Sequence, residues 1–147
     1  RLVWNDIVYQ PGELTAVALA PDGSELARET VRTASASAAL ALSADRTELA
    51  ADGEDLAFIS VSIVDKDGTL QPSVEHSVRF EVTGAGSFAA AGNGDSTSTE
   101  LFCAGSIKAF HGQCVCIVRA GTAPGRLRLT ATADGLPSAE IELEVKK

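Results

Sequence analysis

Methionine is absent from this chain of 147 residues, and the side chains that most often carry chemistry are few. The sequence has two histidines, three cysteines, one tryptophan and one tyrosine, and none of them is grouped with another in a known motif. We expect a chain without an initiator methionine to have been processed or cut from something longer. We predict no catalytic, cofactor-binding or metal-binding residue and no cofactor, while any substrate-binding residue stays open.

Basic side chains are also scarce, with 12 lysines and arginines against 20 aspartates and glutamates and a net charge of −8. Phosphate backbones and anionic membrane surfaces are bound by clustered basic residues. We therefore expect neither nucleic acid nor membrane as a partner. Apolar runs are short as well, and none approaches the ~20 residues that a membrane helix needs.

Alternation of apolar and polar residues is what the sequence has in abundance. Hydrophobic residues make up 45% of the chain, which favours a packed core over disorder. A period of two places one set of side chains on each face of a strand. The pattern therefore predicts antiparallel sheets with one buried and one solvated face. It is clearest in residues 57–63, 77–82, 126–131 and 140–145.

Turn signals lie close to these segments. The dipeptide Asp-Gly occurs at residues 22–23, 52–53, 67–68 and 134–135. Tight turns require a positive φ, which glycine accepts without a Cβ clash. Many short strands with turns about every ten residues are typical of a β-sandwich. The predicted fold is all-β, an Ig-like antiparallel β-sandwich of about seven or more strands.

The small-residue segment 33–38 is interpreted as a linker that divides the chain unequally. Three strands are expected before it, at residues 2–9, 13–20 and 25–32. Three strands rarely make an independent sandwich. We therefore predict that residues 1–35 are the incomplete end of a preceding β domain and that residues 36–147 form the sandwich.

Three loop motifs have a structural and a functional interpretation. Residues 92–98, GNGDSTS, lack the following helix of a dinucleotide site, so a turn or bulge is favoured over it. Residues 65–68, DKDG, begin like a calcium loop, but the twelfth position is His76 where a glutamate is needed. A hairpin turn is the better interpretation, with an incidental cation as the alternative. His76 and His111 lack the paired spacing of a zinc site and are expected in solvated loops.

The three cysteines leave one question open. Cys114 and Cys116 project from the same face of one expected strand, so we predict that they act as small core hydrophobes. A bridge from Cys103 to either of them would suit an exported protein. The sequence does not choose between free thiols and such a bridge.

Longer stretches resemble a known family. Residues 9–18, YQPGELTAVA, and residues 30–34, TVRTA, resemble the closing strands of a β-sandwich in family-2 glycoside hydrolases. The sequence after them is similar to the C-terminal bacterial Ig-like domain of β-galactosidases in that family, and more loosely to invasin-type repeats. The matching pieces are residues 42–49, 51–56, 64–68, 92–95 and 108–112.

The resemblance implies a non-catalytic accessory domain of a bacterial β-galactosidase that takes part in carbohydrate degradation. Such an enzyme holds two carboxyl groups about 5–5.5 Å apart on a (β/α)₈ barrel of ~250 residues, for which this chain is too short. The implied partners are the catalytic and neighbouring modules of the same parent. Residues 1–35 are expected to expose apolar faces and unpaired strand edges, through which a second copy could pair, and a polysaccharide is the partner under the carbohydrate-binding alternative. The implied location is periplasmic or secreted.

Two alternatives belong to other classes of protein. A carbohydrate-binding module would use exposed rings such as Phe58 or Trp4, whereas Phe80 faces the predicted core and Tyr9 lies in the incomplete segment. The low aromatic content, 5% of the chain, disfavours the carbohydrate-binding hypothesis. An invasin-like adhesion repeat would occur in tandem, and this chain contains one full unit.

Overall fold

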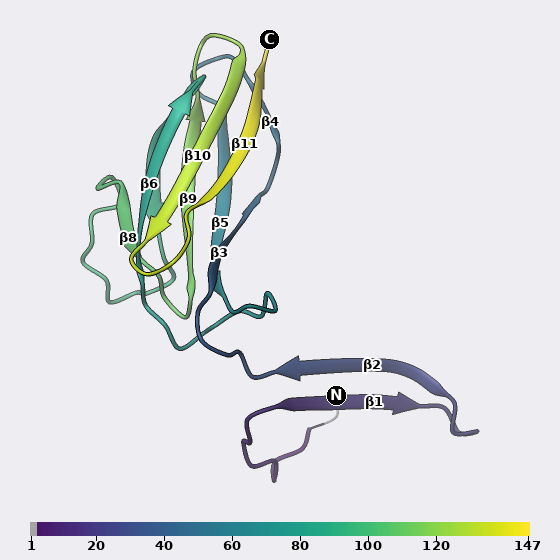
Figure 1. Cartoon of the computed structure of the whole chain (residues 1–147). Coiled ribbons are helices and arrows are strands. Elements are labelled where there is room, and N and C mark those ends of the chain that lie inside the picture. The colour runs from purple at the N-terminus through teal and green to yellow at the C-terminus, as the bar shows by residue number, and fades with distance from the viewer. Residues whose placement is uncertain (1–2) are drawn as a thin grey trace. The chain divides into compact units, whose positions relative to one another are not determined.

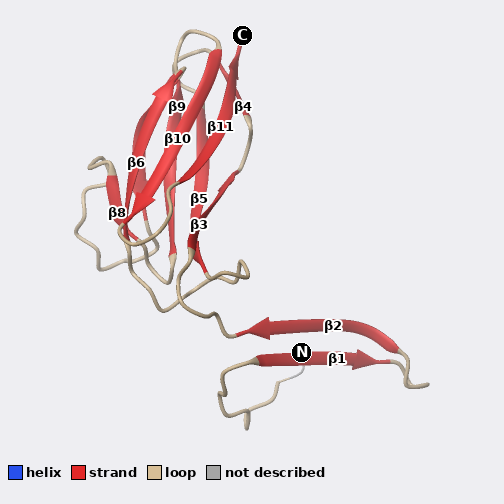
Figure 2. Ribbon diagram, viewed as in Figure 1, coloured by secondary structure: helices blue, strands red, loops and turns tan. Residues whose placement is uncertain are grey.

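The computed structural model describes residues 3–147 of the chain. It divides into two compact units, Arg1–Thr33 and Ala34–Lys147, each of which is considered by itself. Every regular element of the described part is a β-strand (Figure 2). No helix long and apolar enough to cross a membrane occurs among these residues.

The first unit contains a hairpin of β1 (Glu13–Leu19) and β2 (Glu25–Arg32), which pair antiparallel (Figure 1). The hydroxyls of Thr15 and Thr30 lie 2.9 Å apart across the ladder. The predicted turn at Asp22 closes it, because the Asp22 carboxylate accepts hydrogen bonds from the amide and hydroxyl of Ser24 at 3.0 and 2.7 Å.

One of the three strands expected in this unit is not formed. Residues 3–9 adopt no strand, and Leu2 lies outside the described residues. An apolar pattern alone does not make a strand, because a strand needs a neighbour for its backbone hydrogen bonds. The sheet of this unit contains only β1 and β2 among the described residues.

The second unit is a sandwich of a five-stranded sheet, β4-β11-β10-β6-β8, and a four-stranded sheet, β3-β5-β9-β7 (Figure 1). These nine strands confirm the predicted all-β sandwich. The strands are β3 (Ala39–Ala44), β4 (Glu48–Ala50), β5 (Leu56–Val64), β6 (Ser77–Gly84), β7 (Gly86–Gly92), β8 (Ser106–Lys108), β9 (Gln113–Ala120), β10 (Gly125–Ala133) and β11 (Ala139–Lys146).

The expectation of purely antiparallel sheets is wrong at one edge. β4 pairs with β11 in parallel, with Leu49 opposite Val145. Parallel neighbours need a long connection, and these two strands are joined through most of the sandwich. Strand alternation cannot reveal this, because it assigns faces to residues and leaves the direction of the neighbour undetermined.

The core lies between the two sheets and is built from the alternating residues of the predicted strands. Ile59, Leu129 and Leu143 are fully buried. Phe80 of β6 and Phe88 of β7 bring the sheets together, with ring centroids 6.3 Å apart and planes inclined by 17°. The core position predicted for Phe80 is confirmed.

The outer face of the five-stranded sheet has the charge that the alternation predicts. Arg128 of β10 contacts Glu142 of β11 at 2.7 Å, and Glu140 lies 3.8 Å from the same guanidinium. Opposite charges across a ladder stabilise a strand pair modestly. The acidic and basic residues of these strands therefore support the sheet.

The Asp-Gly turns are also confirmed. The glycines at positions 23, 53, 68 and 135 all have φ between +80° and +85°. Residues 33–38, expected as a linker, contain no strand.

Candidate interaction surfaces

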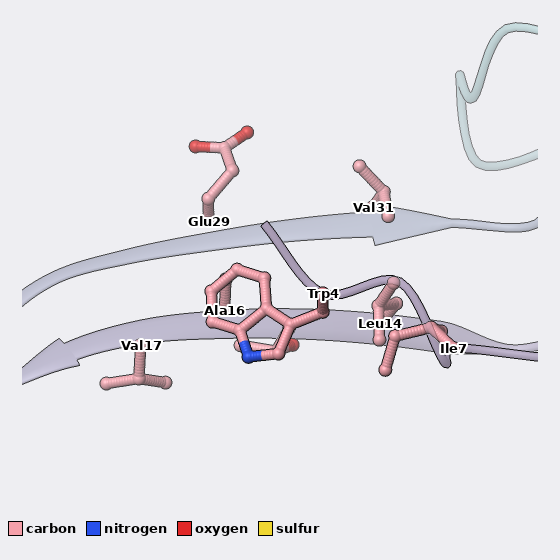
Figure 3. Close-up of a pocket in the computed structure, with 8 residues that line it drawn as sticks. Trp4, Ile7, Leu14, Ala16, Val17, Glu29 and Val31 are labelled. Carbon is pink, nitrogen blue, oxygen red and sulfur yellow. The ribbon is translucent and has the colours of Figure 1, made fainter. Parts of the chain in front are cut away.

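The hairpin has an exposed apolar face. Leu14 and Val31 lie opposite each other across the ladder, and both side chains are more than half exposed. Together with Trp4 and Ile7 they line a hollow of about 350 Å³ (Figure 3). Contiguous exposed apolar surface of this kind is typical of a contact with another protein surface.

A second candidate surface lies on the sandwich around residues 109–112, the segment that connects β8 of one sheet to β9 of the other. Phe110 and Gln113 exchange two backbone hydrogen bonds, of 2.8 and 3.0 Å, around His111 and Gly112. The Phe110 and His111 rings are 4.2 Å apart and inclined by 59°. His111 is exposed, as predicted for a loop residue. His76 is half-buried, so it is less solvated than predicted.

Two hollows flank these rings and share Asn93 and Phe110. One, of about 470 Å³, is also lined by Ser60, His111 and Gln113. The other, of about 240 Å³, is lined mainly by polar side chains of the loop after β7 and of β8. The sequence pattern did not predict these two hollows. Their lining comes from segments that are distant in sequence, such as Ser60 of β5 and the loop after β7.

The loop after β7 is held by its own polar residues. Asn93 donates from Nδ2 to the Lys108 carbonyl at 2.7 Å and accepts from the Asp95 amide at 3.1 Å. Asp95 accepts from the hydroxyl and amide of Thr97, and these bonds lower the pKa of its carboxyl. Ser96 and Thr97 form a turn, as the predicted turn or bulge requires, and no helix follows among residues 3–147.

Charged groups border the smaller hollow. The Lys108 ammonium lies 2.6 Å from the Glu75 carboxylate, which raises the pKa of Lys108. The Glu100 carboxylate accepts from the Lys108 amide at 3.2 Å through both oxygens. The hollow therefore offers carboxylate, ammonium and hydroxyl groups side by side.

The loop at residues 65–68 is a turn. Asp65 is 4% exposed, and one oxygen accepts from the amides of Asp67 and Thr69, each at 2.9 Å. The other accepts from the amide and hydroxyl of Ser35. Led by the bond from the Ser35 amide, these interactions lower the pKa of Asp65 to about 2. Both carboxylate oxygens are therefore used by donors of the chain itself.

All three thiols are free in the structure. Cys114 and Cys116 are buried in the core, as predicted, and Cys103 is exposed. Burial raises the pKa of Cys114 and Cys116 to about 12. The two buried thiols act as small hydrophobic side chains.

The two rings named for a carbohydrate-binding module lie in different units. Phe58 on β5 is 44% exposed and Trp4 in the first unit is 65% exposed. Phe58 lines neither hollow beside Phe110. Neither unit therefore contains both rings, and neither unit by itself forms a site from the pair.

The fold and these surfaces define an Ig-like β-sandwich module whose carboxylates stabilise turns and strands. Residues 40–142 match the model of glycoside hydrolase family 2 C-terminal domain 5. The chain belongs to this family of C-terminal domains and is a non-catalytic part of family 2 glycoside hydrolases.

Relatives and solved structures agree with this assignment. The chain is 34% identical over all 147 residues to a β-galactosidase of Bacteroides ovatus and covers 17% of it. Half of the chain is 41% identical to a β-galactosidase of Thermoanaerobacter pseudethanolicus and covers 10% of that protein. A crystal structure of a glycosyl hydrolase family 2 member from Bacteroides cellulosilyticus has a TM-score of 0.91 and 36% identity, over 96% of this chain and 18% of that one. The chain spans less than a fifth of these relatives.

Proposed function

We propose that the chain is the C-terminal accessory part of a longer bacterial β-galactosidase and serves to position the neighbouring modules of that enzyme. Residues 36–147 are its Ig-like domain, and residues 1–35 supply the last strands of the preceding β domain. The observation that carries the proposal is the exposed apolar face of the hairpin, with Leu14 opposite Val31.

The occupant of that face is the remainder of the preceding β domain in the same polypeptide. A two-stranded hairpin is marginally stable in water by itself and needs further strands against its apolar side. The relatives matched over the full chain extend well beyond it, since the chain covers 17% of the Bacteroides ovatus protein. A covalently attached neighbour is also present at high effective concentration.

Substitution of Leu14 by serine tests whether the preceding β domain covers the apolar face of the hairpin. In the 147-residue chain Leu14 is 53% exposed, so Leu14→Ser is expected to leave the free energy of unfolding almost unchanged. In the longer polypeptide the same change removes a buried side chain and is expected to cost about 2 kcal/mol. Leu101→Ser is the matched control, because Leu101 is 70% exposed on the sandwich unit.

Chemical denaturation of both polypeptides with both variants measures these differences. Equal effects of Leu14→Ser in the short and the long polypeptide would show that the preceding domain does not cover the face. Light scattering on residues 1–147 and 34–147 tests the competing occupant, since a dimer formed only by the longer of the two would place a second copy there, and the shorter one keeps the bond from Ser35 to Asp65.

The proposed parent hydrolyses β-galactosides with two carboxylates in another module, and it acts in the periplasm or outside the cell. The names of the relatives, both bacterial β-galactosidases, support the activity. The 147-residue chain is expected to release no chromophore from a nitrophenyl β-galactoside, whereas the complete polypeptide does. Turnover by the short chain would refute the accessory role.

A further inference from the structure

We propose that the surface of the sandwich around Phe110 and His111 binds a short segment of a neutral saccharide. This inference rests on the proposed function, in which the chain accompanies a glycoside hydrolase. Its site is the pair of hollows, of about 470 and 240 Å³, that share Asn93 and Phe110. The larger hollow lies within the range of about 300–1,000 Å³ that small-molecule sites measure, and the smaller one extends it past Asn93 and Phe110.

The turn that presents the rings is conformationally costly. His111 has φ of 49° and is the only residue other than glycine with a positive φ among residues 3–147. Two-residue hairpin turns of this type favour asparagine at that position. A histidine here sacrifices some stability and places a second ring 4.2 Å from Phe110. Backbone strain of this kind clusters at functional sites.

Polar groups surround the rings from several elements. The hydroxyl of Ser60 and the amide of Gln113 come from β5 and β9, and Thr97 and Glu100 come from the loop after β7. Asn93 lies between the hollows with its amide held by the Lys108 carbonyl and the Asp95 amide. The site is therefore largely preformed, which lowers the entropic cost of binding.

The chemistry of the lining selects the ligand class. A purely apolar ligand would take water away from the Lys108 and Glu75 side chains, which are more than half exposed, and offer no hydrogen bond in return. An anion would face Glu75, Asp95 and Glu100, which outnumber the Lys108 ammonium. No group of three or more His, Cys, Asp or Glu side chains among the described residues is arranged to hold a metal ion. A neutral saccharide matches both features, since its hydroxyls donate and accept hydrogen bonds and its C–H faces pack on rings.

The test is a titration of the ¹⁵N-labelled 147-residue chain, observed by amide NMR, with lactose, cellotetraose and xylotetraose. Tetragalacturonate is the anionic control. At least one neutral sugar is expected to give saturable shifts at residues 93–97 and 108–113. His111→Asn keeps the turn and removes the ring, and Phe110→Leu keeps an apolar side chain. Each is expected to weaken binding about tenfold or more.

Phe58→Leu is the matched control, because it removes an exposed ring outside both hollows. It is expected to leave the affinity unchanged, while His111→Asn keeps or raises the melting temperature as it loses affinity. Absence of saturable shifts with every neutral sugar would overturn the inference. So would equal binding of tetragalacturonate, or loss of binding in Phe58→Leu alone. None of these outcomes changes the result expected for Leu14→Ser. The saccharide site and the proposed function can therefore be refuted independently.

Discussion

The carboxylate of Asp65 accepts two hydrogen bonds from Ser35, from its amide at 2.9 Å and from its hydroxyl at 3.2 Å. The contact fastens the first residues of the sandwich unit to the turn after β5. The Ser35 carbonyl is held as well, by the Gln71 side-chain amide at 2.8 Å. The segment before β3 is thus fixed by side chains distant in sequence.

The Asp65 contact predicts a pH dependence of stability. The pKa of Asp65 in the folded chain is about 2, below its ordinary 3.8. The carboxylate therefore stabilises the fold above the unfolded pKa, and this contribution is lost as the pH falls through the folded one. Asp65→Asn is expected to be less stable than wild type at neutral pH, with the difference shrinking as the pH falls from ~4 to ~2.

Urea denaturation at a series of pH values measures this difference. The other carboxyl groups with lowered pKa, such as Asp95 and Glu142, are present in both proteins and cancel in the comparison. A difference that stays constant over the whole pH series would show that the Asp65 carboxylate does not titrate with folding.

The thiols are expected to differ sharply in reactivity. The thiolate is the reactive form, and burial raises the pKa of Cys114 and Cys116 to about 12. Cys103 is free and exposed. Ellman's reagent is therefore expected to modify one thiol in the native chain and all three after denaturation. Cys103→Ser should abolish the native reaction, and a rapid reaction in that variant would contradict the buried placement.

Gly112 is expected to tolerate no side chain. A Cβ there would lie 2.2 Å from the Gln71 carbonyl oxygen, and φ is +73°. Gly68 has a similar φ of +81° but no atom within 4 Å of the added Cβ. Gly68→Ala should cost about 1 kcal/mol from the backbone alone, and Gly112→Ala about 2 kcal/mol more because of the clash.

Thermal and urea melts of the two alanine variants separate these effects, since the backbone cost is common to both. Similar destabilisation of the two would mean that the turn at Gly112 moves away from Gln71 without cost.

The ion pairs on the outer sheet face are expected to contribute little. Arg128 and Glu142 approach to 2.7 Å, but their side chains are 51% and 41% exposed. Exposed pairs contribute about 1 kcal/mol or less and are screened by salt. Arg128→Ala should therefore lower the stability only slightly in dilute buffer and even less in ~1 M NaCl. A larger loss that salt does not reduce would indicate that the arginine stem packs on the sheet.

The amino-acid sequence by itself determined the elements and their faces. Alternation marked β5, β6, β10 and β11 because a strand exposes and buries its side chains with a period of two. The Asp-Gly dipeptides marked the turns because their backbone requirement is local. The same period placed Cys114 and Cys116 in the core, and the order of the short motifs indicated the family.

Only the tertiary structure decided which distant residues meet. The parallel pairing of β4 with β11, the bond from Ser35 to Asp65 and the approach of Ser60 to the Phe110 turn all depend on strand neighbours. The missing strand at residues 3–9 has the same cause. A strand forms backbone hydrogen bonds only with a neighbouring strand. The alternation within one segment therefore indicates that it favours the strand conformation but does not show which segment pairs with it.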